Sequence, residues 1–406
     1  MQSIPDSLAQ LIAPDSPVGE FAARLALHGH RCYLVGGSVR DAVLGRVHVD
    51  LDVATDAHPH AVSAVLKGWA DAVWLQGERF GTVGFEKDGA PVEVTTFRAE
   101  VYRPESRKPY VEYSDSIETD LSRRDFTVNA MAVSVPDGVV VDPYGGAADL
   151  EARVLRTPLS PAVSFTDDPL RMLRAARFTA TYGLAPAPEL VAAMEEYAER
   201  IEIISAERVR DELSKLVVAS DPCPGFGLLD STGLRRHVLP EELDVEHLVG
   251  AAHSLVVRLS VLLAPSGGEA ARARVRALRF PNDVIDAVAR VVAVAQQVEA
   301  VDRWSDAAVR RVAVRGGAHF DDVLAVCAAR GTGAAFRERV VRLSANEDLT
   351  AITVPIDGSD VMARLTLAPG REVGEALAHV MDVRIERGPL DRAAALDALD
   401  DWAGGR

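Results

Sequence analysis

Hydrophobic and polar positions follow different periods in the two parts of the chain. Up to about residue 150, short apolar runs with the period of strands alternate with runs of helical period. The strand-like runs are RCYLVGG, VDLDVAT, GTVGFEK, VEVTTFR, TVNAMAVSV and GVVVDPYGG. From about Asp168 onward, apolar residues recur at helical spacing and strand-like runs are rare. The pattern predicts an α+β fold, with a head of mixed sheet and helices followed by an all-helical part.

Breaks in this pattern suggest three divisions of the chain. We predict a head over residues 1–150, a helical neck over 151–220, and a helical body and tail over 221–406. The stretch VVASDPCPGFG (217–227) marks the second boundary. Within the head, the polar segment 99–117 interrupts the strand pattern, and its length predicts a mobile loop with a function of its own.

Composition narrows the possible partners and the compartment. The 406 residues are 48% hydrophobic, which is ample for a buried core, and the net charge is −16. A nucleic acid would therefore have to be bound through local basic patches. Three widely spaced cysteines suggest neither a disulfide framework nor a zinc site. We find no pattern of a signal peptide or a membrane span, so a cytoplasmic protein is expected.

A glycine turn follows the first predicted strand. In LVGGSVRDAVLG, Gly36 and Gly37 follow the strand, Ser38 is placed to cap a short helix with Asp41 three residues on, and Gly45 ends that helix. A strand–glycine–helix turn lets backbone N–H groups approach a phosphate closely. The glycines alone are equally compatible with an ordinary tight turn.

Two aspartates alternate with apolar residues in the next strand. In HVDLDVAT, Asp50 and Asp52 point to one face, and the apolar side chains point to the other. Two carboxylates this close repel each other unless a cation lies between them, and Mg²⁺ binds such oxygen ligands together with substrate phosphates. Glu93, in PVEVTTFR, is the candidate third carboxylate on a neighbouring strand. For Asp50 and Asp52, the alternative is that they lie on a solvent-facing edge strand. For Glu93, the alternative is an exposed glutamate on a strand.

Several motifs, in order, carry a resemblance to a known family. After the glycine turn and the aspartate strand come EVTTFR, DLSRRDFTVNAMAV, DPYGGAADL, DDPLRMLRAARF and ISAERVRDEL. Over about residues 30–216 the chain resembles the bacterial and eukaryotic class of tRNA nucleotidyltransferases, the CCA-adding enzymes, which share their head with bacterial poly(A) polymerases. The resemblance implies a polymerase-β-like nucleotidyltransferase head. It also implies template-independent transfer from CTP and ATP to the 3′ acceptor end of tRNA, with two Mg²⁺ ions.

The resemblance also implies roles for individual residues. Asp50 and Asp52 would hold the metal ions, with Glu93 as a further catalytic carboxylate. Asp125 and Asn129 would recognise the ribose from one face of a turn, although capping of a helix by Asp125 and a backbone contact of Asn129 are alternatives. The nucleotide-binding set implied by the resemblance is Gly36, Gly37, Ser38, Arg40, Arg123, Arg124, Asp125, Asn129, Asp168, Arg171, Arg174 and Arg177. For Arg40, the alternative is a charge on a helix surface.

The segment DDPLRMLRAARF carries the chemistry of base selection. Asp168 and Arg171 are three residues apart and so are neighbours on a helix. A carboxylate accepts from the exocyclic amine of C or A, and a guanidinium donates to their ring acceptors, whereas G and U present the opposite pattern. The resemblance assigns this templating role to the pair, with Asp167 where the family often has Glu. A plain helix salt bridge is the alternative.

Two further segments bear on substrate and product. The resemblance implies that the 99–117 loop, with Arg103, Arg107 and Lys108, supports incorporation of A. In the body, Ala264-Pro265 stands where many relatives carry the His-Asp pair of a phosphohydrolase, so no such activity is expected. The helix ARARVRALRF carries candidate RNA contacts, or else a solvated helix face: Arg272, Arg274 and Arg276.

The sequence therefore predicts an enzyme that builds or repairs the 3′-CCA end of tRNA. The alternatives in the same family are a poly(A) polymerase and an enzyme that adds only CC or only A. A more distant alternative is an enzyme that nucleotidylates a small molecule or a protein. The sequence does not determine the oligomeric state.

Overall fold

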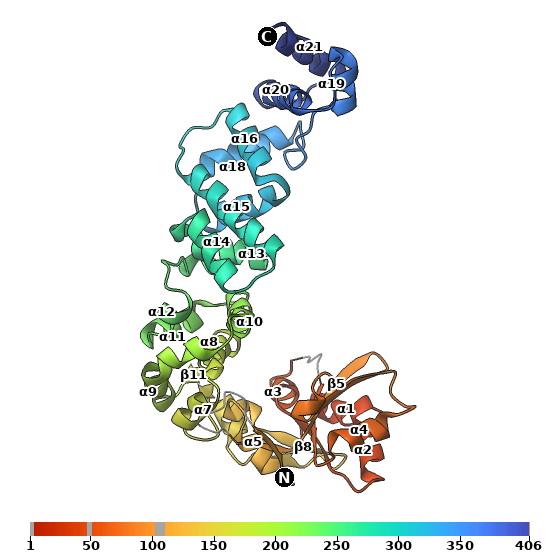
Figure 1. Cartoon of the computed structure of the whole chain (residues 1–406). Coiled ribbons are helices and arrows are strands. Elements are labelled where there is room, and N and C mark those ends of the chain that lie inside the picture. The colour runs from red at the N-terminus through yellow and green to blue at the C-terminus, as the bar shows by residue number, and fades with distance from the viewer. Residues whose placement is uncertain (1–3, 47–50, 102–109, 406) are drawn as a thin grey trace. The chain divides into compact units, whose positions relative to one another are not determined.

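The computed structural model describes residues 4–46, 51–101 and 110–405, which form two compact units (Figure 1). Unit 1 comprises Met1–Ile204 and Gly227–Val238, and unit 2 comprises Ser205–Phe226 and Leu239–Arg406. The division predicted above into head, neck and body is finer than this and stays a prediction.

A seven-stranded mixed sheet forms the centre of the head. Its strand order is β3-β4-β5-β2-β1-β8-β9, and β2 and β5 pair in parallel while the other neighbours are antiparallel. The strands are β1 (Cys32–Val35), β2 (Leu51–Thr55), β3 (Ala72–Trp74), β4 (Thr82–Lys87), β5 (Ala90–Thr96), β8 (Ala132–Val135) and β9 (Val140–Val141). The predicted mixed sheet is confirmed.

The alternating pattern decides which face of the sheet is buried. Val53, Val94 and Phe85 are buried on one face, which α4 (Pro59–Leu66) covers together with α2 (Pro17–Ala26) (Figure 1). The ring of Phe21 on α2 packs 5.0 Å from the ring of Phe85. The other face carries the polar positions of β2 and β5, so the head keeps its polar chemistry on one side of the sheet.

The remaining helices of the head are short. They are α1 (Asp6–Leu11), α3 (Gly37–Val43), η1 (Glu78–Phe80), α5 (Ile117–Ser122), η2 (Thr127–Asn129) and α6 (Gly146–Glu151). Ile117 and Leu121 of α5 pack with Val35, Ala54 and Phe97 in a buried cluster. Part of the polar face of the sheet is therefore covered by α5.

Two parts of the segment predicted as a mobile loop are strand. β6 (Arg98–Val101) and β7 (Tyr110–Tyr113) pair antiparallel, with Arg98 opposite Tyr113. The prediction of a loop is therefore wrong for 99–101 and 110–113, because these two stretches satisfy each other's backbone groups. Arg103, Arg107 and Lys108 lie outside the described residues.

After β9, the described residues of unit 1 are helical apart from one short parallel pair of strands. These strands are β10 (Val154–Leu155) and β11 (Ala185–Pro186). The helices are α7 (Pro161–Asp167), α8 (Leu170–Tyr182), α9 (Pro188–Tyr197), η3 (Ala198–Ile203) and α12 (Arg235–Val238), while α11 (Cys223–Ser231) spans the division between the units. Ser160 caps α7 by accepting from the N–H of Val163, as a serine before a proline-started helix predicts.

All the regular secondary structure in the described residues of unit 2 is helical. Its elements are α10 (Ala206–Val217), η4 (Glu246–Leu248), α13 (Leu255–Leu263), η5 (Ala264–Ser266), α14 (Gly268–Ala277), α15 (Asn282–Glu299), α16 (Asp306–Gly316), η6 (Gly317–His319), α17 (Phe320–Ala329), α18 (Ala334–Ser344), α19 (Gly358–Leu365), α20 (Arg371–Arg387) and α21 (Arg392–Gly404). α15 packs against α13, α14 and α17, and the last three helices form a smaller cluster of their own. No helix in the described parts of the chain has the length and apolarity that a membrane crossing requires.

Candidate active site

The glycine turn leaves β1 at the polar face of the sheet. Gly36 has φ +68° and precedes α3, and a Cβ there would lie 2.7 Å from Nη1 of Arg124 and 3.6 Å from Oδ2 of Asp52. The positive φ therefore favours glycine, and a side chain there would also displace the Arg124 guanidinium. The turn brings a backbone loop, an arginine and a carboxylate together, although they are distant in sequence.

Ser38 has a different role from the predicted one. Gly36, and not Ser38, stands at the N-cap of α3, and Ser38 lies inside the helix. Its Oγ accepts a hydrogen bond of 3.0 Å from the backbone N–H of Asp52. The expectation of a Ser38 cap is wrong because the hydroxyl satisfies a donor on the neighbouring strand instead. Gly45 has φ +66° directly after the C-cap, as predicted for the end of α3.

Asp52 and Glu93 are neighbours in the sheet. In the parallel pairing of β2 with β5, Asp52 lies opposite Glu93, and such partners project to the same face about 5 Å apart. The flanking residues Leu51, Val53 and Val94 are buried on the other side. Asp50 lies outside the described residues. This donor set of carboxylate oxygens on one face suits a hard divalent cation such as Mg²⁺.

A buried aspartate holds the two arginines that follow α5. Asp120 has a fully buried side chain, and its carboxylate accepts from Nη2 of Arg123 at 2.6 Å and from Nη2 of Arg124 at 3.1 Å. Burial by itself would raise the pKa of Asp120, but the charges of both arginines outweigh it, and the pKa is lowered. The sequence interpretation missed Asp120, although its spacing of three and four residues from the arginines on a helix was the signal for it.

The two residues predicted to recognise ribose are in contact. Nδ2 of Asn129 donates to Oδ1 of Asp125 at 2.9 Å, and Arg174 donates from Nε and Nη2 to Oδ2 at 2.8 and 2.6 Å. Burial would raise the pKa of Asp125, whose side chain is 10% exposed, but the Arg174 charge and these hydrogen bonds hold the pKa well below its usual range. Asp125 is therefore ionised at neutral pH and fixes the side-chain amide of Asn129. Asp125 also accepts from the N–H of Phe126.

Arg40 is buried, which excludes the alternative of a surface charge. The residue is 4% exposed, and its guanidinium pairs with Asp41 at 2.9 Å and donates from Nη1 to Oδ1 of Asn129 at 2.5 Å. It also donates to the hydroxyl of Tyr182 and lies 4.1 Å from the centre of that ring. Asn129 therefore bridges two charged groups, Arg40 and Asp125, and its amide orientation is set by both.

Arg171 links α7 and α8 to the segment that contains Arg123. It is 9% exposed, and it donates from Nη1 to Oγ of Ser164 at 2.8 Å and from Nη2 to the carbonyl of Arg123 at 2.5 Å. Asp168 follows the last residue of α7, one residue before the N-cap of α8, and its Oδ1 accepts from the N–H of Leu170 at 3.2 Å. The predicted templating residues thus lie where α7 passes into α8, next to the segment that holds the ribose pair.

Several of the predicted residues of unit 1 are joined by contacts. Contacts run from Gly36 through Arg124 and Asp120 to Arg123 and Arg171. Arg177 stands on the same helix as Arg171, with its guanidinium 4.8 Å from the Phe178 ring centre. In unit 2, Arg272 pairs with Asp286 and Arg274 pairs with Glu241, and both belong to α14, as does Arg276.

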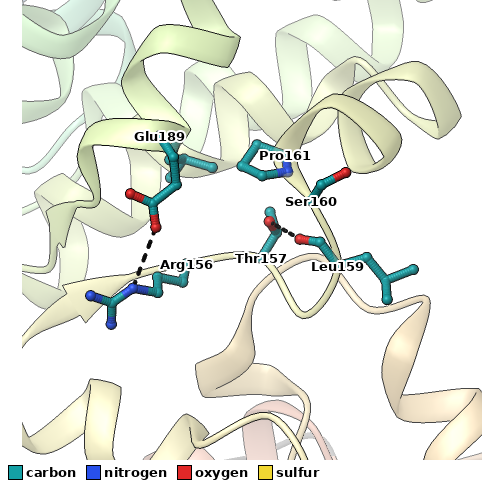
Figure 2. Close-up of a pocket in the computed structure, with 7 residues that line it drawn as sticks. Arg156, Thr157, Leu159, Ser160, Pro161 and Glu189 are labelled. Atoms are coloured by element: carbon teal, nitrogen blue, oxygen red, sulfur yellow. Dashed lines mark hydrogen bonds and ion pairs between the residues drawn. The ribbon is translucent and has the colours of Figure 1, made fainter.

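A cavity elsewhere in unit 1 takes no part in this set. It has a volume of about 250 Å³, and none of the predicted site residues lines it. Figure 2 shows Thr157 donating to the carbonyl of Leu159, and Glu189 paired with Arg156 at 3.5 Å. These contacts join the loop before α7 to α9 and are structural.

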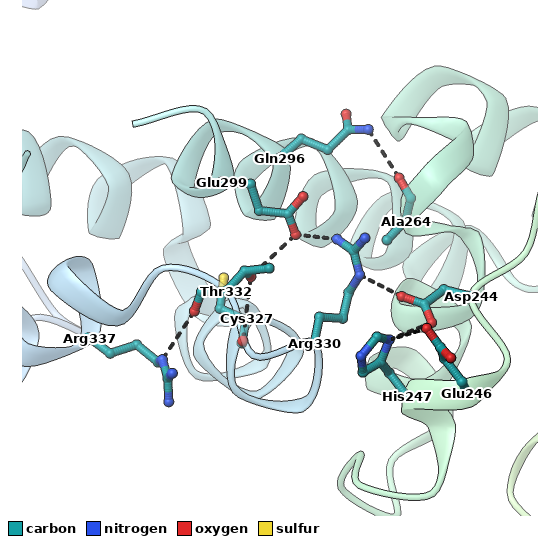
Figure 3. Close-up of polar contacts among 10 residues, drawn as sticks. All are labelled: Asp244, Glu246, His247, Ala264, Gln296, Glu299, Cys327, Arg330, Thr332 and Arg337. Carbon is teal, nitrogen blue, oxygen red and sulfur yellow. Dashed lines mark hydrogen bonds and ion pairs between the residues drawn. The ribbon is translucent and has the colours of Figure 1, made fainter. Parts of the chain in front are cut away.

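A cluster in unit 2 has the composition of a metal site but the contacts of a structural network. Asp244, Glu246 and His247 bring three ligand atoms within 4.8 Å of one another. Both oxygens of Asp244 already accept hydrogen bonds, from Nδ1 of His247 at 2.7 Å and from Nε of Arg330 at 2.7 Å (Figure 3). Arg330 in turn pairs with Glu299, so the network ties η4 to α15 and to the end of α17.

Comparison with known proteins places this arrangement in a family. The model of the poly A polymerase head domain matches residues 32–156, and that of a probable RNA- and SrmB-binding site of polymerase A matches 183–244. The CCA-adding enzyme of Geobacillus stearothermophilus is 31% identical over 364 residues, which cover 87% of this chain and 88% of that protein. That of Levilactobacillus brevis is 38% identical over 229 residues, covering 55% of this chain and 56% of that protein.

Solved structures agree with the sequence comparison. A crystal structure of the Bacillus stearothermophilus CCA-adding enzyme in complex with CTP has a TM-score of 0.78 and 27% identity, and the match covers 95% of this chain and 97% of that one. The Thermotoga maritima CCA-adding enzyme complexed with tRNA has the same fold, with a TM-score of 0.71 at 20% identity. The chain belongs to the CCA-adding enzyme family of nucleotidyltransferases, which confirms the family predicted from its motifs.

Proposed function

We propose that this protein adds C and A to the 3′ end of tRNA from CTP and ATP, without a nucleic-acid template. The observation that carries the proposal is the convergence of Asp52, Gly36 and Arg124 at the polar face of the sheet, with Glu93 on the adjoining strand. The relative crystallised with CTP shares this fold along nearly the whole chain. The identity of the extended tRNA products and the use of both CTP and ATP are part of this proposal.

Each part of the site has a role in nucleotidyl transfer. The Gly36 turn and Arg124 would bind the triphosphate, and the fixed amide of Asn129 with Asp125 would bind the ribose. Asp50 and Asp52 would hold two Mg²⁺ ions, with Glu93 as a further catalytic carboxylate beside them. The ions would supply activation of the attacking 3′-hydroxyl and neutralisation of the departing pyrophosphate. The hydroxyl oxygen attacks the α-phosphorus, and the bond to the pyrophosphate oxygen breaks.

Asp168 and Arg171 are proposed to select the base. The carboxylate would accept from the exocyclic amine of C or A, and the guanidinium would donate to a ring acceptor. Arg171 is held by Ser164 and by the carbonyl of Arg123, which presents its remaining N–H groups in a constant direction. Within this proposal the head is catalytic, the neck reads the base, and the body, with Arg272, Arg274 and Arg276, binds tRNA.

The test is extension of three tRNA transcripts, lacking CCA, CA or only the final A. CTP and ATP are supplied singly and together with Mg²⁺, and products are sized at one-nucleotide resolution. Addition that stops at CCA is expected. Stopping at CC, adding only A, or making long A tails would replace the proposal with the matching alternative in the family.

A substitution tests the carboxylate in the same assay. Asp52→Ala is expected to abolish incorporation while leaving tRNA binding unchanged, because the residue contributes to chemistry and not to the RNA surface. Asp137→Ala, an exposed aspartate in the turn between β8 and β9, is the matched control and should retain wild-type rates. Incorporation at the wild-type rate by the Asp52 variant would refute the assignment.

A further inference from the structure

An exposed tryptophan lies in the same row of the sheet as the candidate catalytic carboxylates. Asp52 on β2 pairs with Glu93 on β5, Glu93 pairs with Gly84 on β4, and Gly84 pairs with Trp74 on β3. Paired residues on adjacent strands project to the same face. One straight row across four strands therefore begins at Asp52 and ends, about 14 Å away by the usual strand spacing, at Trp74.

The indole of Trp74 lies over Gly84 and reaches back toward the carboxylates. A Cβ built on Gly84 would lie 1.8 Å from Nε1 of Trp74 and 2.0 Å from Cε2. The glycine is thus required because the indole occupies the space above it. The ring therefore lies over β4, one strand nearer to Glu93 than the backbone of Trp74 is. Trp74 as a whole is 38% exposed.

An aromatic ring over a strand glycine also stabilises the pairing of two strands, and that role accounts for the inner side of the indole. It does not account for the exposed apolar surface beside it, where Leu75 is 47% and Phe80 40% exposed. The guanidinium of Arg79 lies 4.6 Å from the centre of the Phe80 ring, and Arg98 donates to the carbonyl of Phe80. This edge thus combines exposed aromatic rings with cations in a protein of net charge −16.

The order of the strands shows from which side the acceptor arrives. The Gly36 turn and Arg124, which would bind the triphosphate, belong to β1 and to the segment before β8, on one side of β2. β5, β4 and β3 lie on the other side. In phosphoryl transfer the attacking and leaving oxygens lie roughly in line across the phosphorus. An acceptor hydroxyl opposite the departing pyrophosphate therefore comes from the side of Trp74.

We propose that Trp74 is the stacking platform for a base at the single-stranded 3′ end of the acceptor RNA. Aromatic rings in contact with single-stranded nucleic acid accept any base on their faces, which suits an acceptor end whose last base changes with every addition. The inference rests on the proposed function, since it assigns the acceptor side of the same site.

The test measures kinetics of A addition to a tRNA transcript that ends in CC. Trp74→Ala is expected to raise KM for this tRNA about tenfold or more, because loss of one base–aromatic stack has an effect of that order. The KM for ATP should stay within about twofold. Trp74→Phe keeps a stacking ring and should retain most of the affinity.

The matched control is Val73→Ala. Val73 is 44% exposed on the same strand but pairs with Phe85, on the opposite face, and this variant should match the wild type in both KM values. Tryptophan fluorescence gives an independent readout: the CC-ending tRNA should quench the wild type more than Trp74→Phe, in which the other three tryptophans remain.

The outcomes separate the two proposals. A folded Trp74→Ala variant with unchanged KM for tRNA, or with equal losses for tRNA and ATP, would overturn the platform and leave a structural role for the ring. If the wild type extends no transcript, the proposed function fails. The quenching comparison still decides whether RNA stacks on Trp74, because binding requires no chemistry.

Discussion

At the residue scale, the site depends on charged side chains whose partners are also charged. Asp120 holds two arginines, and Asp125 is held by Arg174 and by the amide of Asn129. A carboxylate removed from water is stable only if its partners replace that water. The pKa values of both aspartates are lowered, so both remain charged throughout the physiological range and keep the arginines in place.

The depressed pKa of Asp125 predicts the pH dependence of its contribution to stability. The folded-state pKa lies below the ordinary aspartate value, which is about 3.9. The stabilisation is therefore fully present above about pH 4 to 5 and is lost as pH falls through the folded pKa. Asp125→Asn should lower the free energy of unfolding by roughly 2 kcal/mol at pH 7, since a hydrogen-bonded charge is removed.

Urea unfolding of wild type and variant from pH 8 down to about pH 3.5 checks this expectation. The difference between the two should be constant from pH 8 to about 5 and shrink below about pH 4. A difference that grows on acidification would contradict the assigned sign.

At the scale of elements, the junction of α7 and α8 positions Asp168 and Arg171, the pair proposed to select the base. Pro169 stands at the N-cap of α8, and Asp168 accepts the N–H of Leu170 at the start of that helix. One turn earlier in α7, Ser164 holds Arg171. The sequence predicted Asp168 and Arg171 as neighbours on one helix, but Asp168 lies before α8 in extended backbone. Arg171 donates to Ser164 and to the carbonyl of Arg123, which sequence spacing does not indicate.

Arg171→Lys tests whether this geometry, and not charge alone, selects the base. A lysine keeps the charge but lacks the planar fork that donates to two partners and a base at once. We expect kcat/KM for CTP and ATP to fall by roughly 10- to 100-fold, about 1.4 to 2.7 kcal/mol, and misincorporation of UTP and GTP to rise relative to CTP.

Arg156→Lys is the matched control, because Arg156 also pairs with carboxylates in unit 1 but lies at the separate cavity of Figure 2. It should retain the wild-type base preference. An Arg171→Lys enzyme with unchanged discrimination would remove Arg171 from the selecting pair.

At the scale of the whole molecule, unit 2 has its own polar core. Glu347 lies between two buried arginines: Arg310 of α16 pairs with it at 2.8 Å, and Arg384 of α20 pairs with it at 2.8 Å. Arg310 also donates to the carbonyl of Ile385 at 3.0 Å. This buried triad joins α16 to α20. Ion pairs as well as packing between these helices therefore hold α20 against the rest of unit 2.

Glu347→Gln should destabilise unit 2 specifically. Removal of the carboxylate leaves two buried guanidinium groups without a counter-charge, which costs roughly 3 to 5 kcal/mol. Hydrogen exchange should accelerate in α16 and α20, measured by mass spectrometry, while peptides of the head keep their rates. Glu338→Gln, at a side chain that is 74% exposed on α18, should change little. Equal effects of the two substitutions would show that the triad contributes nothing to stability.

Much of the head was predictable because its signals are local. The two-residue period placed Asp52 on the polar face of β2 and the apolar residues on the other, and Gly45 marked the end of α3. These features follow from the sterics of neighbouring residues, which act over a few positions of the chain. The ordered motifs also identified the family, which the comparisons confirm.

The remaining features depend on which strands and helices become neighbours. Ser38 supports Asp52, Arg40 is buried against Asn129, and Trp74 shares a row with Glu93. These contacts join positions between 14 and 89 residues apart or depend on the register of four strands. Periodicity within one segment carries no information on the partner of that segment. Burial, ion pairing and register are therefore set only when the sheet and its helices assemble, because only then does each charged group lose water and need a partner.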